Sequence, residues 1–167
     1  CVVLGVTGGI AAYKAAELLR LLVKAGAEVH VIMTSSAQEF VAPLTFQTLS
    51  GNPVHTELFN IIQEQAIGHI SLADRADLLL VAPATANLIG KVANGIADDL
   101  LTTTLMATKA KVLFAPAMNS NMWENPLYKK NQETLEAHGY HFIAPAYGEL
   151  ACGWQGQGKL PDPQEIF

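Results

Sequence analysis

The sequence has little charge. Only 15% of its 167 residues are charged, whereas soluble domains average about a quarter. Its 10 Lys and Arg against 15 Asp and Glu give a net charge of −5, and no run of basic residues occurs. A nucleic-acid-binding domain carries a basic face, so we expect no nucleic-acid partner. A surface with so little charge predicts instead that part of it is buried against further copies of the chain.

Long hydrophobic runs and cysteines are also scarce. The longest strongly apolar stretch, 77–84, is the length of a strand, well below the ~18–20 residues of a membrane span, so we expect no membrane partner. Two cysteines, Cys1 and Cys152, lie at opposite ends, which excludes a disulfide framework and favours a reducing, cytoplasmic setting. The chain begins inside a strand-like run and ends in the Pro-punctuated segment 160–167. We therefore expect that a few residues precede it and that a second domain can follow.

Short apolar runs alternate with segments of helical periodicity along the whole chain. The strands predicted from these runs are 2–6, 28–33, 54–59, 78–82, 112–115 and 140–143. The predicted helices are 11–25, 37–40, 44–49, 70–76, 86–94, 100–108 and 126–138, with Gly26 and Gly139 ending the first and the last. Such alternation predicts right-handed crossovers and a Rossmann-like, doubly wound parallel sheet in a single α/β domain.

Ligands bind beyond the carboxyl ends of the strands in such sheets. Gly8-Gly9-Ile10 follows the first strand and opens a helix, where exposed N–H groups favour a phosphate, although a plain tight turn explains the glycines equally well. After the second strand, Thr34-Ser35-Ser36 replaces the acidic residue that would hold an adenosine ribose. This argues against NAD and allows a mononucleotide such as FMN.

The loop Pro83-Ala84-Thr85-Ala86-Asn87 offers hydroxyl and amide groups without charge. It suits a phosphate or a flavin edge, or else only caps a helix. His69 precedes the same strand; a lone histidine is more often structural than catalytic. His138 and His141 flank a turn and are expected at the surface, so no metal site is predicted.

Pro116 to Trp123 places two methionines, a tryptophan and Asn119 directly after a buried strand. A neutral amide binds a carboxylate without an ion pair that would oppose loss of CO2, and Met and Trp side chains supply an apolar wall. Residues 151–159 are spaced by glycines and contain Cys152. We interpret them as a flexible flap with a thiol acid, against the alternative of an exposed loop with an incidental cysteine.

Together these stretches resemble the flavin-containing cysteine decarboxylases over essentially the whole chain. The strongest matches are P-x-M-N-x-x-M-W at 116–123 and A-C-G…G-x-G at 151–158. The loop 83–87 resembles the family pattern P-A-S-A-N, with Thr85 in place of Ser. Two positions depart from the family: Trp154 stands where an acidic residue is common, and Lys159 where Arg is common.

The resemblance implies that residues 1–167 form an FMN-binding cysteine decarboxylase domain. It implies that His69 is the base, that Asn119 binds the substrate carboxylate and that Cys152 donates a proton. It also implies that Met118, Met122 and Lys159 bind the substrate. The residues implied to hold FMN are Gly8, Gly9, Ile10, Ser35, Ser36, Thr85, Asn87 and Ala117.

The resemblance also implies a reaction: conversion of 4′-phospho-N-pantothenoylcysteine to 4′-phosphopantetheine in coenzyme A biosynthesis, through a thioaldehyde and an enethiolate. It implies homo-oligomers built on trimers, dodecamers among them, and common fusion to a C-terminal phosphopantothenate–cysteine ligase domain. Two alternatives stay open: a peptidyl-cysteine decarboxylase of lantibiotic maturation, and a flavin prenyltransferase or flavin-binding protein on the same scaffold. The joint presence of Asn119 and Cys152 argues against the second alternative.

Overall fold

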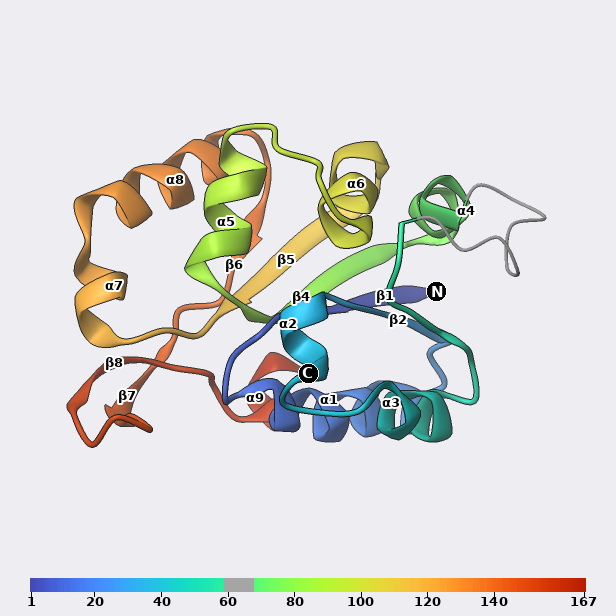
Figure 1. The fold of residues 1–167 in the computed structure, drawn as a ribbon, viewed down its shortest axis with the longest axis horizontal. Coiled ribbons are helices and arrows are strands. Elements are labelled where there is room, and N and C mark those ends of the chain that lie inside the picture. Colours follow the sequence, from blue (N-terminus) through green and yellow to red (C-terminus); the bar gives the residue numbers. More distant parts are fainter. Residues whose placement is uncertain (59–67) are drawn as a thin grey trace.

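A computed structural model describes residues 1–58 and 68–167. Its centre is a sheet of six parallel strands in the order β3-β2-β1-β4-β5-β6 (Figure 1). The strands are β1 (Val2–Val6), β2 (Val29–Met33), β3 (Val54–His55), β4 (Leu78–Ala84), β5 (Lys111–Pro116) and β6 (His141–Phe142). The chain reverses its direction of winding between β1 and β4, which confirms the predicted Rossmann-like, doubly wound sheet.

Helices cover both faces of the sheet (Figure 1). One face carries α1 (Ala12–Lys24), α3 (Pro43–Ser50) and α9 (Pro163–Ile166), and the other carries α4 (Gly68–Arg75), α5 (Ala86–Ala93), α6 (Leu100–Ala107) and α8 (Pro126–Ala137). Two short helices, α2 (Ser35–Gln38) and α7 (Ser120–Glu124), follow β2 and β5. In the described part of the chain, no helix has the length and apolarity needed to cross a membrane.

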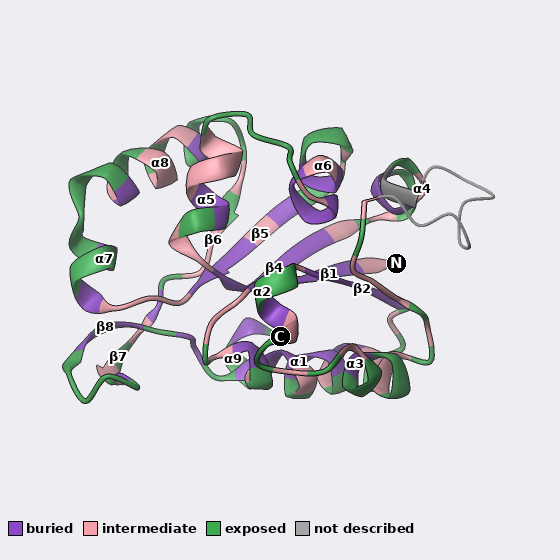
Figure 2. Ribbon diagram, in the orientation of Figure 1, coloured by how far each residue is buried: buried purple, intermediate pink, exposed green. Residues whose placement is uncertain are grey.

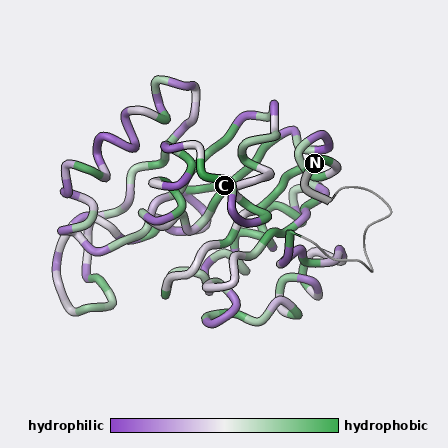
Figure 3. The backbone as a smooth tube through the Cα atoms, turned by 45° about the horizontal axis from the view of Figure 1, so that its top comes forward, coloured by the Kyte–Doolittle hydropathy of each residue, from purple (hydrophilic) through white to green (hydrophobic). Residues whose placement is uncertain are grey.

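The hydrophobic core consists of two clusters, one on each face of the sheet. Because successive side chains of a strand point to opposite faces, Leu4 packs in the cluster that includes α1, whereas Val3 packs with α5, α6 and α8. The central strands are accordingly buried along almost their whole length (Figure 2). Apolar segments gather in the middle of the molecule, and hydrophilic stretches mark the outer helices (Figure 3). This rigid centre fixes the positions of the loops that follow the strands.

Most predicted elements are confirmed, including the glycines that end α1 and α8. Gly26 and Gly139 adopt φ of 88° and 87°, the left-handed conformation that a glycine tolerates best. Pro43 begins α3 at its first turn, because proline lacks only an N–H that a helix start does not use. The predicted strand 54–59 is shorter: β3 ends at His55, and Phe59 lies outside the described residues.

One prediction at the C-terminal end was wrong. Residues 151–159 are not a uniformly flexible flap, because β8 (Gln155–Lys159) pairs antiparallel with β7 (Ala146–Glu149). The turn between them is exposed, whereas Gly156 and Gly158 are buried (Figure 2). The Pro-punctuated segment forms α9, which packs on α1 through the buried Ile166.

Candidate functional site

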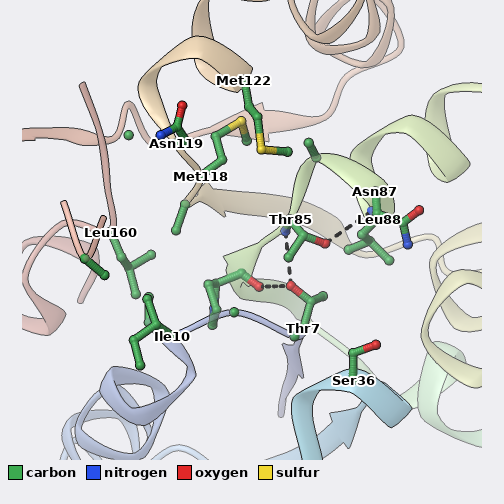
Figure 4. Close-up of a pocket in the computed structure, with 18 of the residues that line it drawn as sticks. Thr7, Ile10, Ser36, Thr85, Asn87, Leu88, Met118, Asn119, Met122 and Leu160 are labelled. Atoms are coloured by element: carbon green, nitrogen blue, oxygen red, sulfur yellow. Dashed lines mark hydrogen bonds between the residues drawn. The ribbon is translucent and has the colours of Figure 1, made fainter. Parts of the chain in front are cut away.

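A cavity of about 1160 Å³ lies beyond the carboxyl ends of β1, β4 and β5 (Figure 4). It is lined by every residue predicted for cofactor, substrate or catalysis except His69: Gly8, Gly9, Ile10, Ser35, Ser36, Thr85, Asn87, Ala117, Met118, Asn119, Met122, Cys152 and Lys159. The backbone of His69 belongs to α4, but its side chain lies outside the described residues, so its role stays a prediction. The cavity exceeds the usual ~300–1,000 Å³ of a single ligand pocket, which leaves room for a cofactor and a substrate together.

Thr7 joins the two central loops and was not predicted as a site residue. Its buried hydroxyl donates to the carbonyl oxygen of Pro83 at 2.6 Å and accepts from the Thr85 N–H at 3.1 Å (Figure 4). The loop after β1 is thereby held against the loop after β4. A hydroxyl residue that ends an otherwise apolar, buried strand was the available signal, because a buried hydroxyl needs hydrogen-bond partners.

The two glycines after β1 have different surroundings. A Cβ at Gly8 would overlap Ser36 and lie 2.8 Å from its backbone carbon, so Gly8 allows the loops after β1 and β2 to approach each other. A Cβ at Gly9 would meet nothing within 4 Å. Both residues line the cavity. At this turn the close approach is therefore made to the chain itself at Gly8, whereas Gly9 leaves open space for a ligand.

The N-terminal turns of α1 and α5 suit an anion. The first turn of α1 contains no acidic residue, and no side chain caps it. At α5, the Thr85 hydroxyl caps the helix by accepting from the Leu88 N–H at 3.3 Å. Helix N-termini attract anions because their first N–H groups lack partners within the helix and the helix dipole is positive there.

Three lysines line the cavity, and two of them are paired. Lys91 donates to both carboxylate oxygens of Asp98 at 2.8 and 2.9 Å, and this hydrogen bond raises the pKa of Lys91. Lys14 contacts Asp162 at 2.9 Å, and its hydrogen bond and charge lower the pKa of that carboxyl. Among the residues that the structure describes, Lys159 has no acidic side chain within ion-pair distance. Lys159 is therefore the lysine of the cavity that is left to pair with an anionic ligand.

Asn119 and Cys152 meet at the mouth of the cavity. The Asn119 Oδ1 accepts from the Asn121 N–H at 2.8 Å and so caps α7. This contact fixes the orientation of the amide, because only the oxygen can accept from an N–H. The amide nitrogen therefore faces the flap, and it lies 3.4 Å from the Cys152 Sγ. The structure thus presents an amide donor and a thiol side by side, with Asn119 half-buried and Cys152 exposed.

The predicted apolar wall is only partly correct. Met118 and Met122 line the cavity, but Trp123 does not, because it is buried against the ring of Tyr128 with 5.3 Å between centroids. Trp154 in the flap turn is 52% exposed. His138 and His141 are exposed as predicted.

One cluster of possible metal ligands lies at the opposite edge of the sheet. Cys1, Glu28 and His30 place ligand atoms within 4.8 Å of one another. The Glu28 carboxylate is already bound by the guanidinium of Arg75 and by the His30 ring, and both interactions lower the pKa of Glu28. The cluster is therefore a satisfied polar network, and it lies far from the cavity.

Comparison with known proteins identifies the family of this chain. A family model described as Flavoprotein matches residues 1–167. The chain belongs to the flavoprotein family. This assignment agrees with the observed sheet and with the cavity at its carboxyl edge.

Relatives and solved structures carry the comparison further. The chain is 56% identical over 165 residues to the Coenzyme A biosynthesis bifunctional protein CoaBC of Bacillus subtilis, a match that covers 99% of the chain and 41% of the relative. A PPC decarboxylase solved with pantothenoylaminoethenethiol superposes with a TM-score of 0.87 and 32% identity, covering 99% and 92% of the two chains. The structure of the FMN-dependent cysteine decarboxylase SpaF superposes with a TM-score of 0.84 and 27% identity, covering 99% of this chain and 95% of the SpaF chain. The flavoprotein chain thus spans about two fifths of the curated relatives it matches.

Proposed function

We propose that this flavoprotein domain is an FMN-dependent decarboxylase that converts 4′-phospho-N-pantothenoylcysteine to 4′-phosphopantetheine in coenzyme A biosynthesis. The observation that carries the proposal is the pairing of Asn119 with Cys152, 3.4 Å apart at the mouth of the cavity. The name of the Bacillus subtilis relative and the PPC decarboxylase structure support this substrate.

FMN fits the residues of the cavity. Open space above Gly9, uncharged hydroxyl and amide groups at Ser36, Thr85 and Asn87, and the N-terminus of α1 together suit a phosphate and a flavin edge. The residues that would hold FMN are Gly8, Gly9, Ile10, Ser35, Ser36, Thr85, Asn87 and Ala117. When bound, FMN supplies reversible two-electron chemistry at the cysteinyl carbon–sulfur bond. Decarboxylation of an N-acyl cysteine without a cofactor has no such chemistry available.

Asn119 binds the substrate carboxylate in this proposal. Its amide is held by the cap on α7, so its N–H groups point toward the flap, where a carboxylate would lie. A neutral donor holds the carboxylate without stabilising its charge as strongly as an arginine would. The apolar side chains of Met118 and Met122 line the same part of the cavity, and a water-poor wall favours the loss of charge when CO2 leaves.

Cys152 is the proton donor, and His69 is the base. The exposed Cys152 thiol stands on the flap turn, within reach of a substrate that Asn119 holds. Its proton would complete the saturated thiol product. His69 is assigned through the resemblance to the flavin-containing cysteine decarboxylases. Lys159, which has no acidic partner among the described residues, is proposed to pair with an anionic group of the substrate.

The proposal extends to the larger protein and its assembly. A ligase domain after residue 167 is supported by the bifunctional relatives, of which the chain spans 41%. Homo-oligomers built on trimers, up to dodecamers, are supported by apolar side chains exposed at the rim of the cavity, Ile10 and Tyr13 at about 60% each. Exposed apolar side chains mark a protein interface when they form a contiguous patch. We place the protein in the cytoplasm, where coenzyme A is synthesised.

A peptidyl-cysteine decarboxylase is the second candidate, because the SpaF structure is also similar. The test is CO2 release from the purified, FMN-loaded protein, with 4′-phospho-N-pantothenoylcysteine compared with a peptide that ends in cysteine. We expect release from the first substrate only. Preference for the peptide would contradict the proposal and favour the peptidyl-cysteine decarboxylase. Release of CO2 from neither substrate would favour a prenyltransferase or a flavin-binding role. His69→Asn serves as the control: it should retain FMN and abolish turnover.

A further inference from the structure

The flap lies directly on the loop that carries Asn119, and two glycines make this contact possible. The Met118 N–H donates to the carbonyl oxygen of Gly158 at 2.9 Å, and a Cβ at Gly158 would overlap the carbonyl oxygen of Met118. A Cβ at Gly156 would lie 2.8 Å from the Cβ of Ser120, closer than real Cβ atoms approach. The residues on both sides of Asn119 therefore each touch a glycine of β8.

These contacts determine how far Asn119 lies from Cys152. Two hydrogen bonds close the turn that carries the thiol, from Leu150 N–H to Trp154 oxygen and from Gly153 N–H to Leu150 oxygen, each 2.8 Å long. Cys152 is thus carried by a closed turn whose second strand lies on the Asn119 loop. Any displacement of β8 from that loop moves the thiol away from the amide.

We propose that Gly156 and Gly158 are positioning residues that set the separation between the Asn119 amide and the Cys152 thiol. The consequence for catalysis rests on the proposed function, in which Asn119 holds the substrate and Cys152 protonates it. A methyl group at either glycine lifts β8 from the loop and separates the two groups. The spacing of the glycines thus allows β8 to pack closely on the loop that carries Asn119. In this proposal, the exposed turn is the part of the flap that can move.

The chain offers matched variants that separate this inference from a general loss of stability. In Gly156→Ala the obstacle is the side chain of Ser120, so Ser120→Gly removes it. In Gly158→Ala there are two obstacles, the backbone oxygen of Met118 and the φ of 145° at position 158, and no substitution elsewhere removes either. Gly148→Ala is the control, because its Cβ would meet only the flexible Lys159 side chain, at 3.6 Å and beyond.

The separation is measured by disulfide trapping in the FMN-loaded protein, in a Cys1→Ser, Asn119→Cys background. Oxidised glutathione takes two electrons from the thiol introduced at position 119 and from Cys152, and two glutathione molecules are released. The effective concentration of the two thiols should fall about tenfold or more in Gly156→Ala and Gly158→Ala, and stay unchanged in Gly148→Ala. Ser120→Gly should restore it in Gly156→Ala and leave Gly158→Ala unrestored. Flavin absorbance shows that each variant is folded; if Gly158→Ala fails to fold, the Gly156 pair alone decides.

Equal trapping in Gly156→Ala and Gly148→Ala would overturn the inference. Turnover of the same glycine variants with Asn119 and Cys152 intact separates it from the proposed function. Reduced trapping together with reduced turnover supports both. Reduced trapping with full turnover leaves the geometry standing and refutes the catalytic roles of Asn119 and Cys152.

Discussion

The cavity is built from two regions that use glycine in opposite ways. The first, which we call the cradle, comprises residues 7–11 and 83–88; the second is the flap, residues 151–159. In the cradle, Gly9 leaves space that none of the described residues fills, and the buried Thr7 hydroxyl holds the two loops together. In the flap, Gly156 and Gly158 are buried and fit tightly against the Asn119 loop, whereas the turn and the residues that alternate with these glycines are exposed. In the proposed function, the cradle binds the cofactor and the flap places the reactive thiol.

The largest effect is expected from the thiol of the flap. Cys152→Ser should lower formation of the saturated thiol product by about 10²- to 10⁴-fold, the usual contribution of a positioned proton donor, and the oxidised enethiol should accumulate. Cys1→Ser is the matched control, since Cys1 lies at the opposite edge of the sheet. Products are separated by liquid chromatography and identified by mass. Normal product from Cys152→Ser would remove this residue from the mechanism.

A smaller effect is expected from the hydroxyl that holds the cradle together. Thr7→Val keeps the shape of the side chain but leaves the buried Pro83 carbonyl and the Thr85 N–H without their partner. The free energy of unfolding should fall by about 2–6 kcal/mol, at ~1–3 kcal/mol for each of the two unsatisfied groups. The exposed Thr48 bonds only within its own helix, so Thr48→Val should stay within about 0.5 kcal/mol. Urea unfolding of the FMN-free protein measures both, and equal stabilities would refute this role of Thr7.

The two glycines of the cradle should respond differently to the same substitution. Gly8→Ala forces a methyl group into Ser36 and should destabilise the FMN-free protein by about 1–3 kcal/mol, as overpacking does. Gly9→Ala meets open space, so unfolding should change by less than about 0.5 kcal/mol while FMN binds more weakly. Thermal unfolding and FMN titration of both variants decide. If both variants lose stability equally, the two glycines do not differ as described.

The smallest effect is expected at the edge of the sheet, away from both regions. Burial, together with the nearby His30 and Arg75, lowers the pKa of His55 in the folded protein. Below pH ~6.5, the pKa of a free histidine, the unfolded chain therefore binds more protons than the folded one, and stability falls as the pH falls. His55→Gln should flatten this part of the profile of unfolding free energy against pH, without changing FMN binding. An unchanged slope would contradict the assignment.

The sequence predicts the sheet and the cavity residues because both depend on local patterns. Short apolar runs mark strands covered on both faces, and the loops after them meet at one edge whatever the packing details. The close packing of Gly156 and Gly158 could not be predicted in the same way. Glycine spacing is equally typical of flexible and of tightly packed strands, and the partner loop lies about 40 residues earlier in the chain. Trp123 was misplaced for a different reason: its partner Tyr128 lies only five residues later, but the angle between α7 and α8 that brings the two rings together is not visible in the sequence.

Titration of the FMN-free proteins with FMN, followed by quenching of flavin fluorescence, tests the division between cradle and flap most directly. Cys152→Ser should bind FMN within about twofold of the unchanged protein. Gly9→Ala should bind at least about tenfold more weakly, which corresponds to ~1.4 kcal/mol. Equal weakening in both variants, or unchanged binding in Gly9→Ala, would contradict the account.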